Sequence, residues 1–418
     1  MECRITTADA SVTEQKRDLL AGSSDLYHWW EEPGSTHRRV SAPIFEFLLR
    51  ERLGKARARN LREFVLHRLR LERKDYLRYW RIASGRQRFV ETVNLIRICN
   101  QLGLDYSRLE KSGVLTDRMW PIDLGRPELT MLKSHILNEG TLNSRYVKSL
   151  YVPTRKISVS RATQAQFYNN DRLLHRHIRQ LAKSCGSPKC RTVKSKIGYT
   201  TILDGTTSRA LVRIRTPMGR RSNQSFSLDP SVTNCRRLWM YHFCSTLIEE
   251  GYCSLPLRKS GRLAMEIGYF RGIDITDVVP ASTVRSLACG SRTVIGDLPA
   301  ELLRVVRETP PPLMAQEIDC LRMLHSRAVN PGLWPKPHPY EVRRCLDGDR
   351  LIASWRFVTS RYELITILSA YLEVSIPSWK RRYMQEAYRV YRNSRTKRLA
   401  RPDWRRLLKR LDRRTRRL

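Results

Sequence analysis

Apolar residues recur at helical spacing from about residue 42 to residue 109, in four short stretches separated by glycine or polar residues. Positions three and four apart share one face of a helix, so each stretch predicts a short helix with one buried side. We expect these helices to pack as a compact all-α domain over residues 39–120. Residues 1–38 are mixed and polar apart from an aromatic cluster at 27–30, and we expect a poorly ordered N-terminal arm there.

Beyond Pro127 the hydrophobic pattern switches between helical and strand periods. Apolar residues at alternate positions predict strands over residues 155–161, 209–215 and 262–269, each with one apolar face and one face that is largely basic or polar. Residues 169–186 carry an apolar stripe at helical spacing, and a helix is expected to restart at 310 after an irregular stretch over 276–312. This mixture predicts an α+β architecture.

Two nine-residue segments repeat one pattern: Leu132–Gly140 reads LKSHILNEG and Phe243–Gly251 reads FCSTLIEEG. In each, two apolar residues and a glutamate stand at i, i+4 and i+7, which places all three on one helical face. A serine at the same position in both would let two helix backbones approach closely, and the final glycine ends a helix at low cost. If the helices pack together, Glu139 and Glu250 emerge side by side. Paired carboxylates in basic surroundings outline a metal-dependent phosphodiester site.

The balance of charges points to a polyanionic partner. The chain has 418 residues, of which 78 are Lys or Arg and 40 are Asp or Glu, for a formal net charge of +38. Each phosphate that such a protein neutralises releases condensed counterions, so a nucleic acid is the expected partner. A basic RNA-associated protein of another fold would have the same charge, and a half-buried sheet always has a polar outer face.

The nonamers resemble the LAGLIDADG motif of homing endonucleases, in which two such helices form the interface between repeats and carry acidic metal ligands. Residues 216–234 resemble the strand and loop before the second motif, and residues 351–388 resemble the closing strand, helix and lysine-bearing helix. The resemblance covers roughly residues 127–391. It implies an α+β fold of two pseudo-symmetric αββαββα repeats, 125–232 and 233–392, forming a DNA-binding saddle behind the small all-α domain, with a basic C-terminal tail at 393–418.

The resemblance also implies a ligand set. Glu139 and Glu250 would bind Mg²⁺ or another divalent cation, with further ligands from the backbone carbonyls of Asn138 and Glu249. The metal would polarise the scissile phosphate, activate water and stabilise the leaving oxygen. Both acids are Glu where Asp is commoner in the family.

Two cations complete the implied catalytic set. Lys380, in IPSWKRRY, matches the lysine of the family's second repeat, whereas Arg221, in PMGRRSN, stands where the first repeat should carry a lysine. Arginine cannot act as a base, so this departure weakens one half-site. Lys133 and His135 also replace small or apolar residues of the motif.

Residues 84–110 resemble the closing part of a repressor-type helix-turn-helix domain, which would make residues 72–82 its recognition helix. The alternative is an ordinary helical bundle with a solvated basic face. We expect DNA to be bound by cations of this helix and of the predicted repeats. These are Arg73, Lys74, Arg78, Arg81, Arg145, Lys148, Lys156, Arg161, Lys194, Lys196, Arg209, Arg213, Arg215, Arg258 and Arg262.

Taken together, these features predict a site-specific, metal-dependent DNA endonuclease that cuts both strands and so promotes insertion of its own coding element, as in intron homing. The alternative is a catalytically inactive DNA-binding regulator or an RNA splicing factor that retains the same fold. The expected partner is double-stranded DNA, with RNA as the second choice, and the expected state is a monomer.

The sequence signals that would suggest other classes of protein, such as secreted or membrane-spanning proteins, are weak. The first residues lack the apolar core of a signal peptide, no stretch is long and apolar enough to span a bilayer, and we expect a cytoplasmic protein. The ten cysteines are scattered and are expected to be free thiols. The contexts of the chain ends do not match those of an intein.

Overall fold

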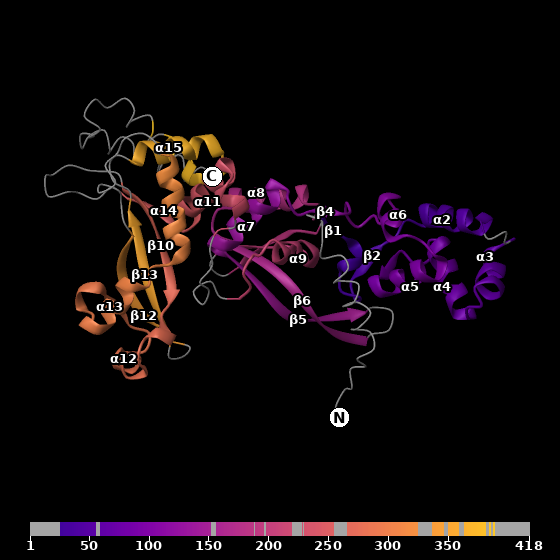
Figure 1. Ribbon diagram of the computed structural model, residues 1–418, viewed down its shortest axis with the longest axis horizontal. Helices are drawn as coiled ribbons and strands as arrows, with labels where there is room; N and C mark the ends of the chain where they lie inside the picture. Colours follow the sequence, from indigo (N-terminus) through magenta and orange to yellow (C-terminus); the bar gives the residue numbers. More distant parts are fainter. Residues whose placement is uncertain are drawn as a thin grey trace. The chain divides into compact units, whose positions relative to one another are not determined.

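The computed structural model describes residues 26–55, 59–151, 156–187, 189–195, 198–219, 228, 230–254, 266–324, 337–346, 350–358, 363–381, 384–385 and 388. The chain divides into two compact units, Met1–Arg126 and Pro127–Leu418. Figure 1 follows both units along the chain, with unit 1 in indigo to violet and unit 2 in magenta to yellow.

Unit 2 begins with a helix, a long hairpin and a second helix. In chain order its first part consists of α7 (Pro127–Glu139), β5 (Gly140–Tyr151), β6 (Lys156–Asn169), α8 (Arg172–Ser184), β7 (Arg191–Ser195), β8 (Gly198–Ile202) and α9 (Gly205–Arg213). The four strands form one antiparallel sheet in the order β5-β6-β8-β7. Phe167 and Ala165 of β6 are fully buried, and they alternate with less buried residues as the strand period requires.

The second part of unit 2 follows the same order, with one insertion. It consists of α10 (Pro230–Thr233), α11 (Arg236–Glu249), β9 (Gly251–Ser254), β10 (Glu266–Asp274), η4 (Thr276–Val278), α12 (Ala281–Ser286), β11 (Arg292–Val294), η5 (Ile295–Asp297), α13 (Ala300–Glu308), α14 (Pro312–Leu324), β12 (His338–Arg344), β13 (Leu351–Val358) and α15 (Glu363–Val374). The sheet order is β11-β12-β13-β10-β9, so β9, β10, β13 and β12 stand where β5, β6, β8 and β7 stand in the first sheet. The segment from η4 to α13 is the insertion (Figure 1).

Two expectations about unit 2 are wrong. Residues 209–215 belong to helix α9 and its end rather than to a strand, because Asp204 caps the helix by accepting from the Thr207 amide at 2.9 Å and Ala210 and Leu211 are buried together on one face. The stretch 276–312 is less irregular than expected, since α13 lies within it and buries Leu302 and Val306. The expected strand over 155–161 and helix over 169–186 are confirmed as β6 and α8.

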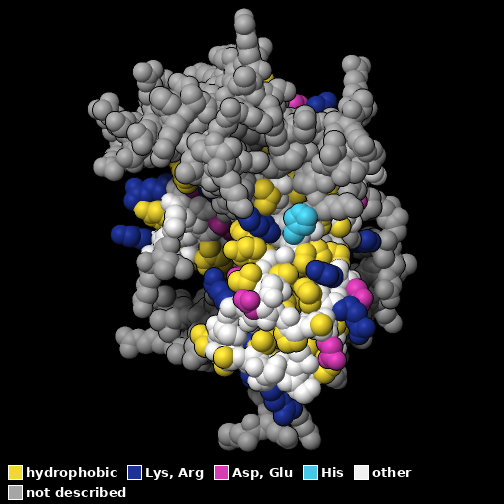
Figure 2. Space-filling view, turned by 90° about the vertical axis from the view of Figure 1, so that its left-hand side faces the viewer, with side chains coloured by type: hydrophobic (Ala, Val, Ile, Leu, Met, Phe, Trp, Pro, Cys, Tyr) yellow, Lys and Arg dark blue, Asp and Glu magenta, His cyan; other side chains and the backbone are white. Residues whose placement is uncertain are grey.

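Among the described residues, basic side chains do not form a continuous surface at the inserted end of unit 2. Figure 2 shows the face at this end, where hydrophobic side chains gather and Lys, Arg, Asp and Glu are scattered among them. Val278, Val294 and Leu346 are among the exposed apolar residues of unit 2. On the described part of this face the charge is therefore mixed.

Unit 1 is mainly helical, with three pairs of short segments that are extended. It consists of β1 (Leu26–Tyr27), η1 (Trp29–Glu31), β2 (His37–Arg39), α2 (Ala42–Lys55), α3 (Leu61–Glu63), η2 (Phe64–Arg68), α4 (Arg73–Ala83), β3 (Phe89–Glu91), α5 (Thr92–Leu102), α6 (Tyr106–Lys111) and β4 (Ile122–Asp123). Strand β1 pairs with β4 and β2 pairs with β3, while Val40 bridges Leu115.

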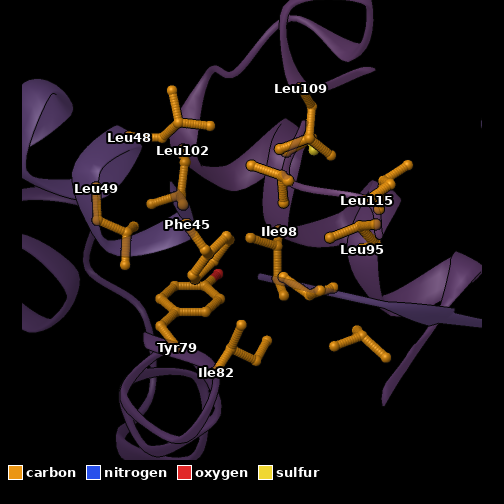
Figure 3. Packing of buried hydrophobic residues seen from close by; sticks show 14 of the residues in the cluster. Phe45, Leu48, Leu49, Tyr79, Ile82, Leu95, Ile98, Leu102, Leu109 and Leu115 are labelled. Carbon is orange, nitrogen blue, oxygen red and sulfur yellow. The ribbon is translucent and has the colours of Figure 1, made fainter. Parts of the chain in front are cut away.

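The core of unit 1 is one cluster of buried side chains from α2, α4 and α5. Figure 3 shows Phe45, Tyr79 and Leu95 within it. Trp29 is also fully buried in this cluster, and Arg38 forms ion pairs with Glu32 at 2.7 Å and with Asp117 at 2.8 Å. The expectation of a poorly ordered arm over residues 1–38 is therefore wrong for residues 26–38, because residues from 26 onward are part of the folded unit. Residues 1–25 lie outside the described residues.

Two expectations of a more general kind can be compared with the described residues. Within them, no helix is both long enough and apolar enough to cross a bilayer. Cys99, Cys185 and Cys244 are buried free thiols, as expected, and so is Cys345. Cys289 is free but exposed.

Candidate active site

Helices α7 and α11, which contain the two nonamers, pack against each other. Asn138 of α7 donates to the Ser245 hydroxyl at 2.8 Å and accepts from the Thr246 hydroxyl at 3.1 Å. Ser134 and Ser245 are both buried, in keeping with the close approach expected at these positions. The two helices thus join through polar as well as apolar contacts.

The glycine that follows each nonamer glutamate is required by space. A Cβ added to Gly140 would lie 2.6 Å from the Ile136 Cα and 2.8 Å from the Gln166 carbonyl oxygen, and one added to Gly251 would overlap the Leu247 carbonyl. Neither glycine is among the residues with positive φ. The chain turns directly from helix into strand here, and only a residue without a side chain fits.

Replacement of Gly251 by alanine is expected to lower the free energy of unfolding of unit 2 by about 3 kcal/mol or more, since the new atom meets backbone that cannot yield. Thermal unfolding followed by circular dichroism measures this loss. Gly296→Ala is the matched control, because a Cβ there has nothing within 4 Å. Equal melting temperatures for the two variants would contradict the steric argument.

Glu139 and Glu250 stand at the ends of the two packed helices. Glu139 ends α7, Glu250 directly follows α11, and burial raises the pKa of Glu139 to about 8 with help from the negative charges of Glu249 and Glu250. Like charges shift a pKa this way only over short distances. The negative charge of Glu250 therefore acts on the Glu139 carboxyl, and the Glu250 side chain is 24% exposed.

Each glutamate has a polar partner on the second strand of its own sheet. Asn169, the last residue of β6, donates its side-chain amide to the Glu139 carboxylate. Arg271 of β10 has a guanidinium nitrogen 3.9 Å from a Glu250 carboxylate oxygen. Sequence reasoning missed both partners, although a signal existed: Arg271 stands among Ile267, Tyr269 and Ile273 on the apolar side of its strand.

Lys380, the cation that the resemblance pointed to, lies at the end of α11. Its ammonium donates to the carbonyl oxygens of Ile248 and Gly251, the latter at 2.8 Å, and its charge acts on Glu139 by lowering the pKa of that carboxyl. Asp171 anchors the segment by accepting from the Ser378 hydroxyl at 2.7 Å and the Trp379 amide at 2.9 Å. Lys380 is thus fixed at the end of α11, where its charge acts on Glu139.

A buried ionic network supports the helix ends from behind. Arg271 donates to Glu317 of α14 at 2.6 Å, to the Asn138 side-chain carbonyl at 2.8 Å and to the Thr246 hydroxyl at 3.2 Å. His242 contacts the same Glu317 oxygen at 2.8 Å. Burial raises the pKa of Glu317, but the charges and hydrogen bonds of Arg271 and His242 together outweigh it and hold the value at about 2. The pair is therefore ionised throughout the usual pH range.

A second buried chain crosses the helix interface. His135 of α7 contacts the Glu249 carboxylate, and its other ring nitrogen lies 2.7 Å from the Tyr241 hydroxyl. His177 of α8 lies 2.6 Å from the same hydroxyl, which can donate to one ring and accept from the other. Both motif departures, Lys133 and His135, are buried; Lys133 donates to the Ile214 carbonyl at 2.7 Å.

Acid is expected to destabilise unit 2 through His177. Burial lowers the pKa of this histidine to about 3, with a smaller effect from His135, while the unfolded chain protonates near pH 6.5. The stabilising effect is complete above the unfolded pKa and is lost as pH falls from 6.5 toward 3. The contribution of His177 to the free energy of unfolding should therefore drop by about 1 to 2 kcal/mol between pH 7 and pH 5. Denaturant unfolding at both pH values measures it as the difference between the wild type and His177→Gln, which should shrink by that amount at pH 5. The difference between the wild type and the exposed His338→Gln should not change with pH.

The structure places the other candidate residues unevenly. Arg73, Lys74, Arg81, Lys194, Arg213 and Arg215 are exposed, Arg78 and Arg209 are half-buried, and Arg78 lies 3.4 Å from Asp75. The backbones of Arg145 and Lys148 lie in β5 and those of Lys156 and Arg161 in β6. Arg221, Lys196, Arg258 and Arg262 lie outside the described residues.

The donor atoms fit a hard divalent cation. Glu139 and Glu250 offer carboxylate oxygens, the ligands that Mg²⁺ prefers, and their mutual repulsion is what a cation would relieve. Among the described residues there is no group of three or more His, Cys, Asp or Glu able to hold a metal by itself. Backbone carbonyls or DNA phosphates would have to complete the coordination.

Comparisons with known proteins give one kind of match. No family model matches the sequence, and neither does any curated protein. Similar solved structures include the LAGLIDADG meganuclease I-AabMI bound to uncleaved DNA (11% identity, 62% of this chain and 88% of that chain, TM-score 0.34). They also include the LAGLIDADG homing endonuclease I-GzeII in complex with its DNA target (9% identity, 67% and 96%, TM-score 0.32) and I-SmaMI bound to uncleaved DNA with calcium ions (10% identity, 64% and 92%, TM-score 0.31).

The structures named here are LAGLIDADG homing endonucleases, the family that the nonamers resemble. The identities are low and the TM-scores describe a distant likeness. We therefore base the functional proposal on contacts within this chain.

Proposed function

We propose that the chain is a site-specific endonuclease of the homing type, which hydrolyses both strands of a DNA duplex with divalent cations held by Glu139 and Glu250. The observation that carries this proposal is the position of these two carboxylates at the ends of two packed helices, where burial and, after it, the like charges of Glu249 and Glu250 raise the pKa of Glu139. A folded protein retains such repulsion at a cost, and a metal-dependent site is a common reason for it.

Unit 2 contains the αββαββα order of elements twice, from α7 to α9 and, with an insertion, from α11 to α15. These two parts support the proposed function as pseudo-symmetric repeats. Each places a motif helix before a hairpin whose second strand contacts the motif glutamate, through Asn169 in one and Arg271 in the other. Together they would form a saddle for a duplex, with the basic faces of the sheets against the phosphates. The net charge of +38 makes a polyanion the natural occupant.

Each residue of the site has a role in this proposal. Glu139 and Glu250 would hold the cation, assisted by the backbone carbonyls of Asn138 and Glu249, and each acid is oriented by its strand partner. Lys380 supplies a fixed positive charge beside the acids, suited to orienting water or stabilising the charge on the phosphate. A bound divalent cation would polarise the phosphate and stabilise the leaving oxygen.

A cleavage screen tests the proposal. The full chain is incubated with a randomised duplex library and Mg²⁺, and the cut ends are sequenced. Cleavage at one recurrent site, abolished by EDTA and by Glu139→Ala or Glu250→Ala, is the expected result. Glu301→Ala, which removes an exposed acid of α13, is the matched control and should cut normally. Tight duplex binding without any cutting would overturn the proposal.

The second candidate, an inactive DNA-binding regulator or RNA splicing factor, is favoured by one observation. With a pKa near 8, Glu139 is largely protonated at neutral pH when no cation is present, which lowers the charge available for metal binding. The same screen separates the two functions, because a regulator would bind duplex DNA and a splicing factor folded RNA without cutting either.

Unit 1 is proposed to add DNA contacts through α4 in the manner of a recognition helix. Arg81→Ala is expected to weaken duplex binding and to lower the slope of log affinity against log salt by about 1, since one phosphate contact is lost. Fluorescence anisotropy over a salt series measures the slope. An unchanged slope would favour the alternative, a helical bundle with a solvated basic face. Arg304→Ala, in α13, is the control.

A further inference from the structure

Asn169 and Arg271 occupy the same place in the two halves of unit 2. In the first sheet Gly140 pairs with Phe167, and in the second Gly251 pairs with Tyr269. Asn169 and Arg271 each stand two residues beyond the paired aromatic residue, on the same face of their strands. The two half-sites therefore differ at one matching position, which is neutral beside Glu139 and cationic beside Glu250.

Arg271 also reaches the motif helix of the other half. One of its terminal nitrogens lies 2.8 Å from the side-chain carbonyl oxygen of Asn138, the residue before Glu139, and the other lies 3.9 Å from a Glu250 carboxylate oxygen. Its guanidinium is buried and fixed by two contacts with Glu317, at 2.6 Å and 3.3 Å. One rigid cation thus sets the position of both motif ends while its charge lies beside only one of the acids.

The charge of Arg271 is shared unequally between its two carboxylate neighbours. Glu317 is closer than Glu250, so it takes the larger part of the interaction, and the remainder acts on Glu250. A guanidinium beside a carboxylate competes with a divalent cation for the same negative charge. A neutral amide such as Asn169 does not compete in this way.

We propose that Arg271 is a positioning residue that makes the half-sites unequal, so that the Glu139 half binds a divalent cation more tightly and one DNA strand is cut before the other. This inference rests on the proposed function. The partial balance by Glu317 limits the difference, which we expect to be about tenfold in cation affinity.

Binding of Mn²⁺ to the full chain on its target duplex tests the inference by electron paramagnetic resonance, at a pH above the Glu139 pKa of about 8 so that both acids are ionised. Glu250→Gln leaves the Glu139 half, Glu139→Gln leaves the Glu250 half, and the variant with both changes gives the background of the DNA. The Glu250→Gln chain should bind Mn²⁺ about tenfold more tightly than the Glu139→Gln chain. Equal affinities would overturn the inference, and so would a tighter Glu250 half.

Strand-specific cleavage provides the second readout. With each strand labelled at one end, a nicked intermediate should accumulate at limiting Mn²⁺ for the wild type, always on the same strand. The double variant Arg271→Gln/Glu317→Gln removes the buried ion pair without leaving a lone charge. In this background the Mn²⁺ affinities of the Glu139 half and the Glu250 half, measured with the same glutamate variants, should come within about threefold of each other. Arg304→Gln should preserve the tenfold difference. If the double variant fails to fold, the comparison of Glu250→Gln with Glu139→Gln still tests whether the two half-sites bind Mn²⁺ unequally.

The failures of the inference and of the proposed function can be told apart. A chain that cuts both strands at one rate and binds two Mn²⁺ ions equally keeps the proposed function and loses the inequality. A chain that neither cuts nor binds Mn²⁺ above background loses both.

Discussion

A chain in which glutamine replaces Glu139 is expected to cut at least one DNA strand about 10³-fold more slowly than the wild type. Glutamine keeps the shape of the side chain and can still accept from Asn169, but it offers no negative charge to a cation. The duplex is expected to bind with nearly unchanged affinity, because the charge that attracts DNA comes from arginines and lysines elsewhere.

The same change should raise stability when no metal is present. The folded pKa of Glu139, about 8, lies above the ordinary value of 4.5, so ionisation opposes folding at every pH above the unfolded pKa. Removing the acid should then raise the free energy of unfolding at pH 8 by about 1 to 2 kcal/mol, a value reduced for the partial exposure of the group. Opposite effects on activity and stability are typical of a functional group kept in an unfavourable place.

Cleavage assays with end-labelled duplex measure the effect on activity, and thermal unfolding in EDTA measures the effect on stability, both on one preparation. Glu301→Gln serves as the control, since it removes an exposed acid of α13. A Glu139→Gln chain that cuts both strands at the wild-type rate would show that this carboxylate holds no essential cation. A chain that loses both cutting and stability would point to a structural role instead.

The local patterns of the sequence predicted the helices that carry the site. The i, i+4, i+7 spacing of Leu132, Ile136 and Glu139 depends only on neighbouring residues, and the structure has a helix there that ends at Glu139. The packing of this helix on α11 followed from the likeness of the two nonamers. Lys380 was found through a resemblance, and the structure places it at the end of α11.

The partners of the glutamates could not be read from spacing, because they come from distant parts of the chain. Asn169, Arg271 and Glu317 meet the motif helices only through sheet register and through a helix that follows the inserted segment. A charged residue on the apolar side of a strand was a usable warning for Arg271. No pattern pointed to Glu317, which looks like an ordinary polar position of an amphipathic helix.

The strand expected over 209–215 failed for a physical reason. Alternation of apolar and basic residues over so short a stretch fits a strand and a single helix turn equally well, and the cap by Asp204 decides for the helix. Residues 26–38 were expected to be poorly ordered because their composition is polar, yet Trp29 and Arg38 are buried. Trp29 donates to the Tyr106 carbonyl and Arg38 pairs with Asp117, and both of these partners lie far along the chain.

Loss of the Glu317 side chain is expected to be the most damaging single change to the fold of unit 2. In Glu317→Ala the Arg271 guanidinium stays buried without its main counter-charge, and His242 loses the carboxylate that it contacts. Breaking one side of a buried ion pair costs about 3 to 5 kcal/mol, which is a large share of the stability of a typical domain. Denaturant unfolding followed by circular dichroism should show the midpoint falling accordingly.

Two companion variants separate the charge from the packing. Glu301→Ala truncates an exposed glutamate in the neighbouring helix α13 and should change stability by less than about 0.5 kcal/mol. Arg271→Met/Glu317→Leu removes both charges and replaces them with apolar side chains, so it should recover much of the loss. If Glu317→Ala and the double variant were equally unstable, packing volume rather than the uncompensated arginine would be the cause. Recovery by the double variant would instead show that the ion pair positions the motif ends at little net gain in stability.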